Sequence, residues 1–246
     1  MTKRRLDLLL VELGFAETRA KAQAMILAGE VSVGGQRAGK AGALWPPDAR
    51  IEVRSRLQKY ASRGGLKLEA ALHDFALDVA GRVCLDIGAS TGGFTDCLLQ
   101  HGAARVYAVD VTTSQLAWKL RQDPRVFRVQ KNARQLVPAD VPEPVDLATV
   151  DVSFISAGKV VRPSARMVRP GGDFLILVKP QFELTRGEIG KGGIVRQRAL
   201  HEKAVARVRQ AVLEAGLEAL GVKASCLAGA EGNQEFFLHA RRKPLE

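Results

Sequence analysis

Apolar positions follow two different patterns along this chain, and the pattern changes at about residue 58. Upstream, apolar residues recur every three or four positions in two segments that end at Gly14 and Gly29, which predicts two short helices. Two short β segments, 31–33 and 50–53, follow them. Downstream, continuous apolar runs alternate with amphipathic stretches, the order typical of a parallel sheet with helical crossovers. We therefore predict a small α+β unit over 1–58, a linker and leading helix over 59–81, and an α/β domain over 82–246.

Within the larger domain the same patterns predict individual elements. Ser62 can cap a helix that runs to about Phe75. Further helices are expected over 114–121, 155–167 and 197–215, the second closed by Pro170-Gly171-Gly172. Strands are expected over 83–87, 105–109, 125–129, 146–151, 173–179, 217–222 and 235–241.

The apolar run 83–87 breaks into a glycine-rich loop, Gly88–Gly93, and the chain restarts as a helix. The loop lacks both the G-x-G-x-x-G spacing of a dinucleotide fingerprint and the Gly-Lys-Ser/Thr of a P-loop. Glycines allow a ligand to approach the backbone, and N–H groups at a helix start can meet a polar group. The next strand ends at Asp110, where nucleotide-binding units place a carboxylate for a ribose. These features favour S-adenosylmethionine as the ligand, with a purely structural turn as the alternative.

Charged residues fall at or near the ends of the predicted elements. Asp151 ends one strand, Lys179 ends another, Lys67 lies near the start of the leading helix, and Glu235 begins the last strand. Ligands of parallel sheets bind outside the carboxyl ends of the strands. A ribose hydroxyl is a poor nucleophile at neutral pH, so a site that methylates it has to remove its proton or stabilise the alkoxide. A lysine can do either if neighbouring cations and desolvation lower its pKa.

The charge balance indicates a polyanionic partner. Lys and Arg number 37 and Asp and Glu 26, a net charge of +11. The three cysteines and four histidines show no metal-ligand spacing, so we expect no metal and a reducing, cytoplasmic environment. The longest apolar runs are too short to span a bilayer, and no secretory signal follows the basic start, so we expect no membrane insertion.

The first quarter of the chain resembles the small RNA-binding module shared by a small-subunit ribosomal protein and several RNA-modifying enzymes. The matching residues are Leu6-Asp7, Leu9-Leu10, Gly14, Thr18-Arg19, Ala22, Ile26, Gly29, Val31, Val33 and Gly35. In that module paired helices present basic residues to structured RNA. The resemblance implies this role for Arg4, Arg5, Arg19 and Lys21, and we add Arg63 from the linker and leading helix. Phosphate contacts of this kind position a substrate rather than specify a base.

With that module, nearly the whole chain resembles the TlyA family, FtsJ-like methyltransferases known both as hemolysin A and as ribosomal RNA 2'-O-methyltransferases. The motifs that support the resemblance are Ser62-Arg63-Gly64-Gly65-x-Lys67-Leu68, Asp86–Phe94, Asp151–Ser156, Val178–Glu183 and Asn233-x-Glu235. It implies a Rossmann-like methyltransferase with a mostly parallel seven-stranded sheet. It also implies that S-adenosylmethionine is the cofactor, a cytidine ribose the substrate, and ribosomal RNA or ribosomal subunits the partners.

The resemblance assigns residues to roles. The catalytic set becomes Lys67, Asp151, Lys179 and Glu235, with Lys179 as base or alkoxide stabiliser, Lys67 assisting, and the two carboxylates holding the arrangement. We assign to the cofactor Asp86, Gly88, Ser90, Thr91, Gly92, Gly93, Phe94, Asp110, Val111, Asn132 and Asp151.

Other functions remain as alternatives. The spacing of the glycine-rich loop disfavours a nucleotide-dependent oxidoreductase. Base methylation is also disfavoured, because the fourth predicted strand ends Asp151-Val152-Ser153-Phe154 and not with the Asn/Asp-Pro-Pro-aromatic stretch of enzymes that methylate an exocyclic amine. A membrane-active hemolysin lacks support, since we find no amphipathic segment of sufficient length. An RNA-binding protein with an inactive methyltransferase domain stays open. The glycine-rich segment 187–196 is either a loop that closes over the site or a surface connection, and the sequence leaves the oligomeric state open.

Overall fold

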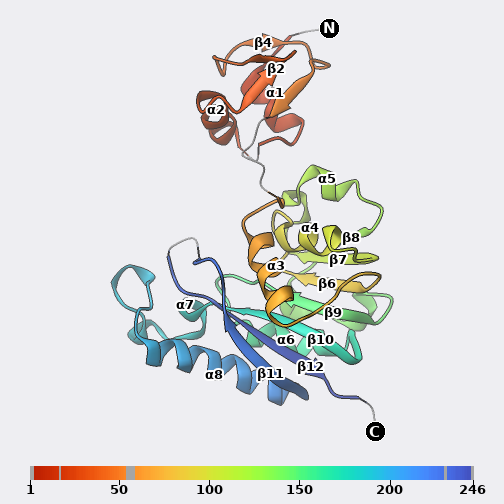
Figure 1. The fold of residues 1–246 in the computed structure, drawn as a ribbon, viewed down its shortest axis with the longest axis vertical. Coiled ribbons are helices and arrows are strands. Elements are labelled where there is room, and N and C mark those ends of the chain that lie inside the picture. Colours follow the sequence, from red (N-terminus) through yellow and green to blue (C-terminus); the bar gives the residue numbers. More distant parts are fainter. Residues whose placement is uncertain (1–2, 17, 54–58, 230–231, 245–246) are drawn as a thin grey trace. The chain divides into compact units, whose positions relative to one another are not determined.

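The computed structural model describes residues 3–16, 18–53, 59–229 and 232–244. The chain divides into two compact units, residues 1–59 and residues 60–246 (Figure 1).

The small unit packs two helices on short strands. Helices α1 (Leu6–Glu12) and α2 (Arg19–Leu27) precede the antiparallel sheet β3-β2-β5, formed by Gln36–Arg37, Val31–Val33 and Ile51–Val53. A second pairing joins β1 (Arg4–Arg5) to β4 (Leu44–Trp45). The apolar positions that recur at helical spacing form its core with the β2 valines: Leu6, Leu10, Ala22, Ile26, Val31 and Val33. The predicted α+β fold is confirmed, whereas the two-residue strands β1, β3 and β4 are too short to leave a pattern in the sequence.

The large unit is built on a seven-stranded sheet in the order β11-β12-β10-β9-β6-β7-β8. Strands β10, β9, β6, β7 and β8 run parallel, and β12 is antiparallel to β10 and β11, so the predicted mostly parallel sheet is confirmed. The strands are β6 (Val83–Ile87), β7 (Arg105–Asp110), β8 (Val126–Gln130), β9 (Val145–Val150), β10 (Val168–Val178), β11 (Leu217–Ala224) and β12 (Phe236–Arg242).

Helices cover both faces of this sheet (Figure 1). They are α3 (Gly64–Asp74), α4 (Gly93–Gln100), α5 (Trp118–Arg121), α6 (Gly158–Ala165), α7 (Pro180–Glu183) and α8 (Arg198–Glu214), with 3-10 turns at 113–115, 133–135, 138–140, 186–188 and 191–193. Leu85 and Ile87 of β6 pack in the cluster that contains residues of α6 and α8, whereas Cys84 packs with residues of α3 and α4. Alternate side chains of a strand point to opposite faces, so the sheet is buried on both sides.

Three local predictions are wrong. The helix expected over 114–121 is split into the turn Thr113–Gln115 and the short α5. Ser62 does not cap α3, whose N-cap is Arg63 without a side-chain hydrogen bond. The Pro170-Gly171-Gly172 turn lies inside β10, because pairing with β9 already begins at Val168 and shifts register before Asp173. The backbone there is close to its neighbours, since a Cβ on Gly172 would lie 3.0 Å from the Asp146 carbonyl oxygen.

Candidate active site

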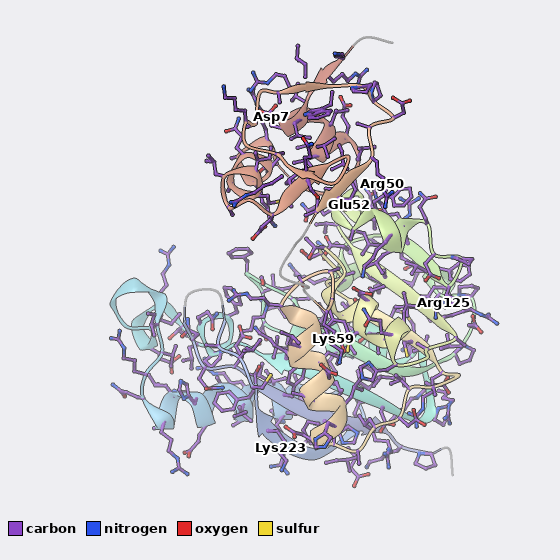
Figure 2. The ribbon with its side chains drawn as sticks, turned by 45° about the horizontal axis from the view of Figure 1, so that its top comes forward. Asp7, Arg50, Glu52, Lys59, Arg125 and Lys223 are labelled. Carbon is purple, nitrogen blue, oxygen red and sulfur yellow. The ribbon has the colours of Figure 1, made fainter. Side chains whose placement is uncertain are left out.

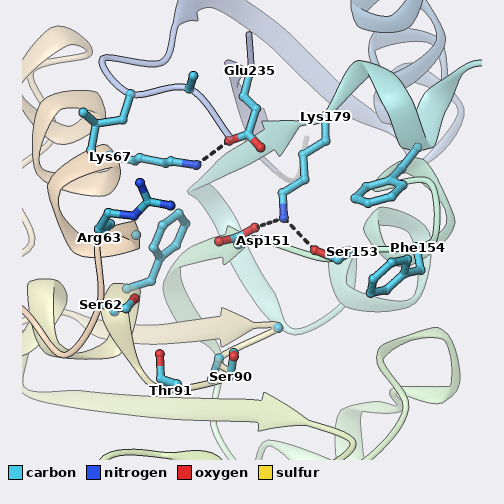
Figure 3. Close-up of a pocket in the computed structure, with 18 of the residues that line it drawn as sticks. Ser62, Arg63, Lys67, Ser90, Thr91, Asp151, Ser153, Phe154, Lys179 and Glu235 are labelled. Atoms are coloured by element: carbon cyan, nitrogen blue, oxygen red, sulfur yellow. Dashed lines mark hydrogen bonds and ion pairs between the residues drawn. The ribbon is translucent and has the colours of Figure 1, made fainter. Parts of the chain in front are cut away.

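A cavity of about 420 Å³ opens where strands β6, β9 and β10 end (Figure 3). It joins the glycine-rich loop, the start of α3, the segments after β9 and β10, and residues before β12. Its lining residues are Ser62, Arg63, Gly64, Lys67, Gly88, Ala89, Ser90, Thr91, Gly93, Phe94, Asp151, Ser153, Phe154, Lys179, Gln181, Phe182, Leu227, Ala228 and Glu235.

The glycine-rich loop has the backbone geometry of a ligand cradle. Gly88 has a φ of +89°, and a Cβ there would lie 2.3 Å from the Asp151 carbonyl oxygen, so only glycine fits. Ser90 adopts the left-handed region without being a glycine, at a φ of +48°. Its amide donates a hydrogen bond of 2.9 Å to Asp110, which also accepts one from the Thr112 amide at 3.0 Å. Asp110 therefore fixes the strained turn of the loop.

Asp86 lies away from the cavity, beneath the loop. Its carboxylate is fully buried and accepts hydrogen bonds from the hydroxyls of Thr95, at 2.6 Å, and Thr149, at 3.1 Å. Burial raises the pKa of Asp86 to about 7, against the hydrogen bonds from the two hydroxyls, which lower it. Asp86 thus ties β6 to β9 and to the first turn of α4.

The residues that we assigned to the cofactor therefore divide into two groups. Six line the cavity: Gly88, Ser90, Thr91, Gly93, Phe94 and Asp151. The other five do not: Asp86, Gly92, Asp110, Val111 and Asn132. Val111 is exposed, and the Asn132 side chain accepts a hydrogen bond from the Arg134 amide at the start of a 3-10 turn.

Four charged residues, far apart in sequence, meet in the cavity as two lysine–carboxylate pairs (Figure 3). The Lys67 amine lies 2.5 Å from Glu235, and the Lys179 amine lies 2.6 Å from Asp151. Lys179 also donates a hydrogen bond of 2.9 Å to the Ser153 hydroxyl. The side chains of both lysines are only 11–12% exposed, so each ammonium depends on its carboxylate for charge compensation.

Several cavity residues received no role in the sequence analysis, although the first four lie in motifs quoted there: Ser153, Phe154, Gln181, Phe182, Leu227 and Ala228. Phe154 is 89% exposed and has a φ of +66°, a strained conformation for a bulky residue. Its ring centroid lies 5.3 Å from that of Phe182. The one signal in the sequence was the position of Ser153 and Phe154 directly after a strand-end aspartate. The segment 187–196 does not line the cavity. The Asn233 side chain holds this segment, because it accepts a hydrogen bond from the Val195 amide and donates one to the Gly193 carbonyl.

The arginines predicted to bind RNA in the small unit are partly engaged by carboxylates. Arg5 and Arg19 both contact the buried Asp7, which is labelled in Figure 2, and Arg4 pairs with Glu12. Hydrogen bonding from the Arg5 guanidinium holds the pKa of Asp7 well below its usual range. The guanidinium-bearing side chains remain 41–54% exposed, so their outer edges stay accessible to a ligand. The Lys21 backbone amide donates to Thr18 at the start of α2.

Arg63, predicted to bind RNA from the linker and leading helix, lines the cavity of the large unit. No helix in the described part of the chain is long and apolar enough to cross a membrane.

Comparisons with known proteins agree with this architecture. Residues 60–242 match the FtsJ-like methyltransferase family, and residues 4–47 match the S4 domain. The 16S/23S rRNA (cytidine-2'-O)-methyltransferase TlyA of Mycobacterium tuberculosis is 45% identical over 239 residues, which cover 96% of this chain and 89% of that protein. Hemolysin A of Brachyspira hyodysenteriae is 42% identical over 238 residues, 96% of this chain and 98% of that one.

A solved structure resembles the fold over nearly its full length. A candidate hemolysin from Streptococcus thermophilus, 42% identical, matches with a TM-score of 0.72 and covers 99% of this chain and 90% of that one. The chain belongs to the FtsJ-like methyltransferase family, with an S4 domain at its N-terminus and relatives named TlyA and hemolysin A.

Proposed function

We propose that this protein transfers a methyl group from S-adenosylmethionine to the 2'-hydroxyl of a cytidine ribose in ribosomal RNA. The observation on which the proposal rests is the position of Lys179 at the end of β10, in the cavity that the glycine-rich loop also lines, with its amine held by Asp151 and Ser153 of the loop after β9. A relative 45% identical over most of the chain is named for this activity.

The glycine-rich loop fits the proposed cofactor. Gly88 and Gly93 let the loop pack closely on its protein neighbours, since a Cβ on Gly93 would lie 2.1 Å from the Ser62 hydroxyl oxygen, and both glycines line the cavity. Each carboxylate oxygen of Asp110 can accept more than one hydrogen bond, so Asp110 can hold the Ser90 amide and still accept from ribose hydroxyls. In this proposal Gly88, Ser90, Thr91, Gly93 and Asp110 hold S-adenosylmethionine. When bound, the cofactor supplies a methyl group made electrophilic by its sulfonium.

Lys179 is the residue that we expect to act on the ribose hydroxyl. The hydroxyl oxygen forms a bond to the methyl carbon while the carbon–sulfur bond breaks, and the hydroxyl proton has to leave. An ammonium has three N–H donors; Lys179 donates one to the Ser153 hydroxyl, and its amine forms an ion pair with the Asp151 carboxylate. A further N–H of the ammonium can stabilise the negative charge that develops on the oxygen, and the hydroxyl proton then passes to the Asp151 carboxylate or to solvent; a neutral Lys179 amine would take that proton itself. A cation that Asp151 and Ser153 already hold in place is effective in this role.

The second pair, Lys67 and Glu235, supports the first. Glu235 is almost fully buried, and it fixes the Lys67 amine at the cavity wall. The Lys67 ammonium adds positive potential where the transition state gains negative charge. An inactive domain that only binds RNA would have no need for two buried ion pairs converging on one cavity, because burying such pairs gives little net stability.

RNA recognition divides between the two units. The S4 domain supplies Arg4, Arg5, Arg19 and Lys21 for phosphate contacts, and Arg63 lies on the cavity wall of the methyltransferase domain. The exposed ring of Phe154, with Phe182 beside it, offers a stacking face to a base turned out of its helix. Ribosomal RNA, free or in a subunit, is the partner that we propose.

The test is methyl transfer from tritiated S-adenosylmethionine to purified ribosomal subunits and to free ribosomal RNA, followed by digestion to nucleosides. We expect label in 2'-O-methylcytidine. Label on a base, or no label although the protein binds the cofactor, would contradict the proposal. A variant such as Arg19→Ala, with the cavity intact, is expected to raise the KM for RNA while the Kd for the cofactor stays unchanged.

A further inference from the structure

Gln181 has a side chain whose hydrogen bonding is incomplete. Its amide oxygen is buried, yet it accepts no hydrogen bond from the residues that the structure describes, and the residue lines the cavity. Buried polar atoms in folded proteins nearly always have a partner, because leaving one unpaired is costly. An unpaired amide oxygen on a residue that lines a cavity is therefore suited to a ligand that brings a donor.

The backbone around Gln181 is firmly held. The residue lies in α7, two positions after Lys179, and Pro180 fixes the start of that helix. At the other end of α7, buried Glu183 accepts a hydrogen bond of 2.7 Å from the Ala157 amide, and Arg207 donates one of 2.6 Å to the Glu183 carbonyl. The segments after β9 and β10 are thus linked, and the backbone of Gln181 is held two positions from Lys179, with both residues lining the same cavity.

The surroundings of Gln181 suit a nucleobase. Phe182 follows it directly and contacts the exposed Phe154, and both rings line the same cavity. A base has an aromatic face and an edge of hydrogen-bond donors and acceptors, and sequence-specific RNA recognition commonly combines stacking on aromatic side chains with hydrogen bonds to that edge. The aromatic pair offers the first contact and the Gln181 amide the second.

We propose that Gln181 reads the base of the nucleotide whose ribose is methylated. Its amide oxygen accepts a hydrogen bond from the exocyclic amine of cytosine, and its amide nitrogen donates to the neighbouring ring nitrogen. Uracil presents the reverse order, a carbonyl oxygen and a ring N–H, so it mismatches the amide with its oxygen in the buried position and pairs only with an amide turned by 180°. This inference rests on the proposed function and makes Gln181 its specificity-determining residue.

The experiment compares two RNA substrates that differ at one position. The methylated cytidine is first mapped, and a second RNA carries uridine there. For each protein we take the kcat/KM on the cytidine RNA divided by the kcat/KM on the uridine RNA. The proteins are the wild type, Gln181→Leu and the unbranched Gln181→Met, and the last guards against misfolding of Gln181→Leu. The control is Gln210→Leu, an exposed glutamine of α8.

We expect both Gln181 variants to lose about 10- to 100-fold in kcat/KM on the cytidine RNA, and their cytidine-to-uridine ratio to fall close to one. Their Kd for S-adenosylmethionine and the kinetics of Gln210→Leu should match the wild type. A wild-type ratio in the Gln181 variants would overturn the inference, as would an equal loss on both RNAs accompanied by weaker cofactor binding, which indicates a structural role. Absence of transfer by the wild-type protein would overturn the proposed function, and this inference with it.

Discussion

The ion pair between Lys67 and Glu235 gives the sharpest test of how the cavity is held together. The Lys67 Nζ and Glu235 Oε2 atoms lie 2.5 Å apart, and the side chains are 12% exposed for Lys67 and 3% for Glu235. The backbone of the adjoining turn also closes on Glu235, since a Cβ on Gly229 would lie 2.5 Å from its carboxylate. The change Lys67→Met removes the cation and leaves the carboxylate buried without compensation.

The expected cost follows from that burial. Removing one partner of a buried pair costs about 3–5 kcal/mol, because the remaining charge has lost its counter-charge in a medium that solvates it poorly. We expect about 3 kcal/mol for Lys67→Met, the lower end, since the pair borders a cavity. Glu235→Gln leaves the Lys67 ammonium uncompensated and should cost a similar amount. The double variant carries neither charge of this pair, so its loss should be smaller than the sum of the two by at least about 2 kcal/mol.

The assay is urea unfolding of the four proteins of this cycle. The chain has two tryptophans, so a Trp45→Phe background leaves Trp118 as the fluorescent reporter of the large unit. The coupling energy is the difference between the loss of the double variant and the summed losses of the single ones. Additive losses, or a loss below about 1 kcal/mol for Lys67→Met, would refute the view that this pair is a coupled buried unit.

Three further changes have expected outcomes. Burial raises the pKa of Asp86 from 3.8 to about 7, so the folded wild type loses stability as pH rises from about 4 to about 7. Asp86→Asn should therefore gain up to about 4 kcal/mol over the wild type at pH 8 and little at pH 4. Thermal melts that show the same stability difference at both pH values would contradict this. The hydrogen bond from Arg5 lowers the pKa of Asp7, so the stability that the Asp7 carboxylate contributes to the small unit is present above pH 4 and is lost on acidification. Asp7→Asn should therefore cost about 1–3 kcal/mol at pH 7. Unchanged hydrogen exchange in residues 4–47 of this variant would argue against that cost. Phe154→Gly removes a side chain from a strained backbone position, so the free energy of unfolding should not fall. It also removes the exposed stacking face, so the KM for RNA should rise about tenfold. An unchanged KM would exclude a role of Phe154 in base stacking.

The sequence predicts the fold well because the fold depends on local patterns. Apolar runs and glycine stops mark the strands and helices, and both units have the expected class. The pairing of Lys67 with Glu235 could not be found this way, since the residues are 168 positions apart and meet only through the strand order. It was the family resemblance that brought the four charged residues together in one set.

Other features of the site depend on packing. Asp86 was assigned to the cofactor, but it points to the same face of β6 as Cys84, under α4, because Leu85 and Ile87 occupy the other face. Strand alternation could have predicted that face if the helices had already been placed. For Gln181 and Phe154 no pattern suffices: an unpaired amide and a solvent-exposed ring become visible only when the surrounding atoms are known.

The central claim is that the Lys179 amine acts on the ribose hydroxyl during methyl transfer, and single-turnover kinetics test it most directly. The rate constant is measured with saturating protein and cofactor for the wild type, for Lys179→Ala and for Lys223→Ala, which removes an exposed lysine of β11 (Figure 2). We predict a loss of about 10²- to 10⁴-fold for Lys179→Ala, with wild-type Kd values for RNA and S-adenosylmethionine, and no loss for Lys223→Ala. A Lys179→Ala rate within a few-fold of wild type would contradict the account.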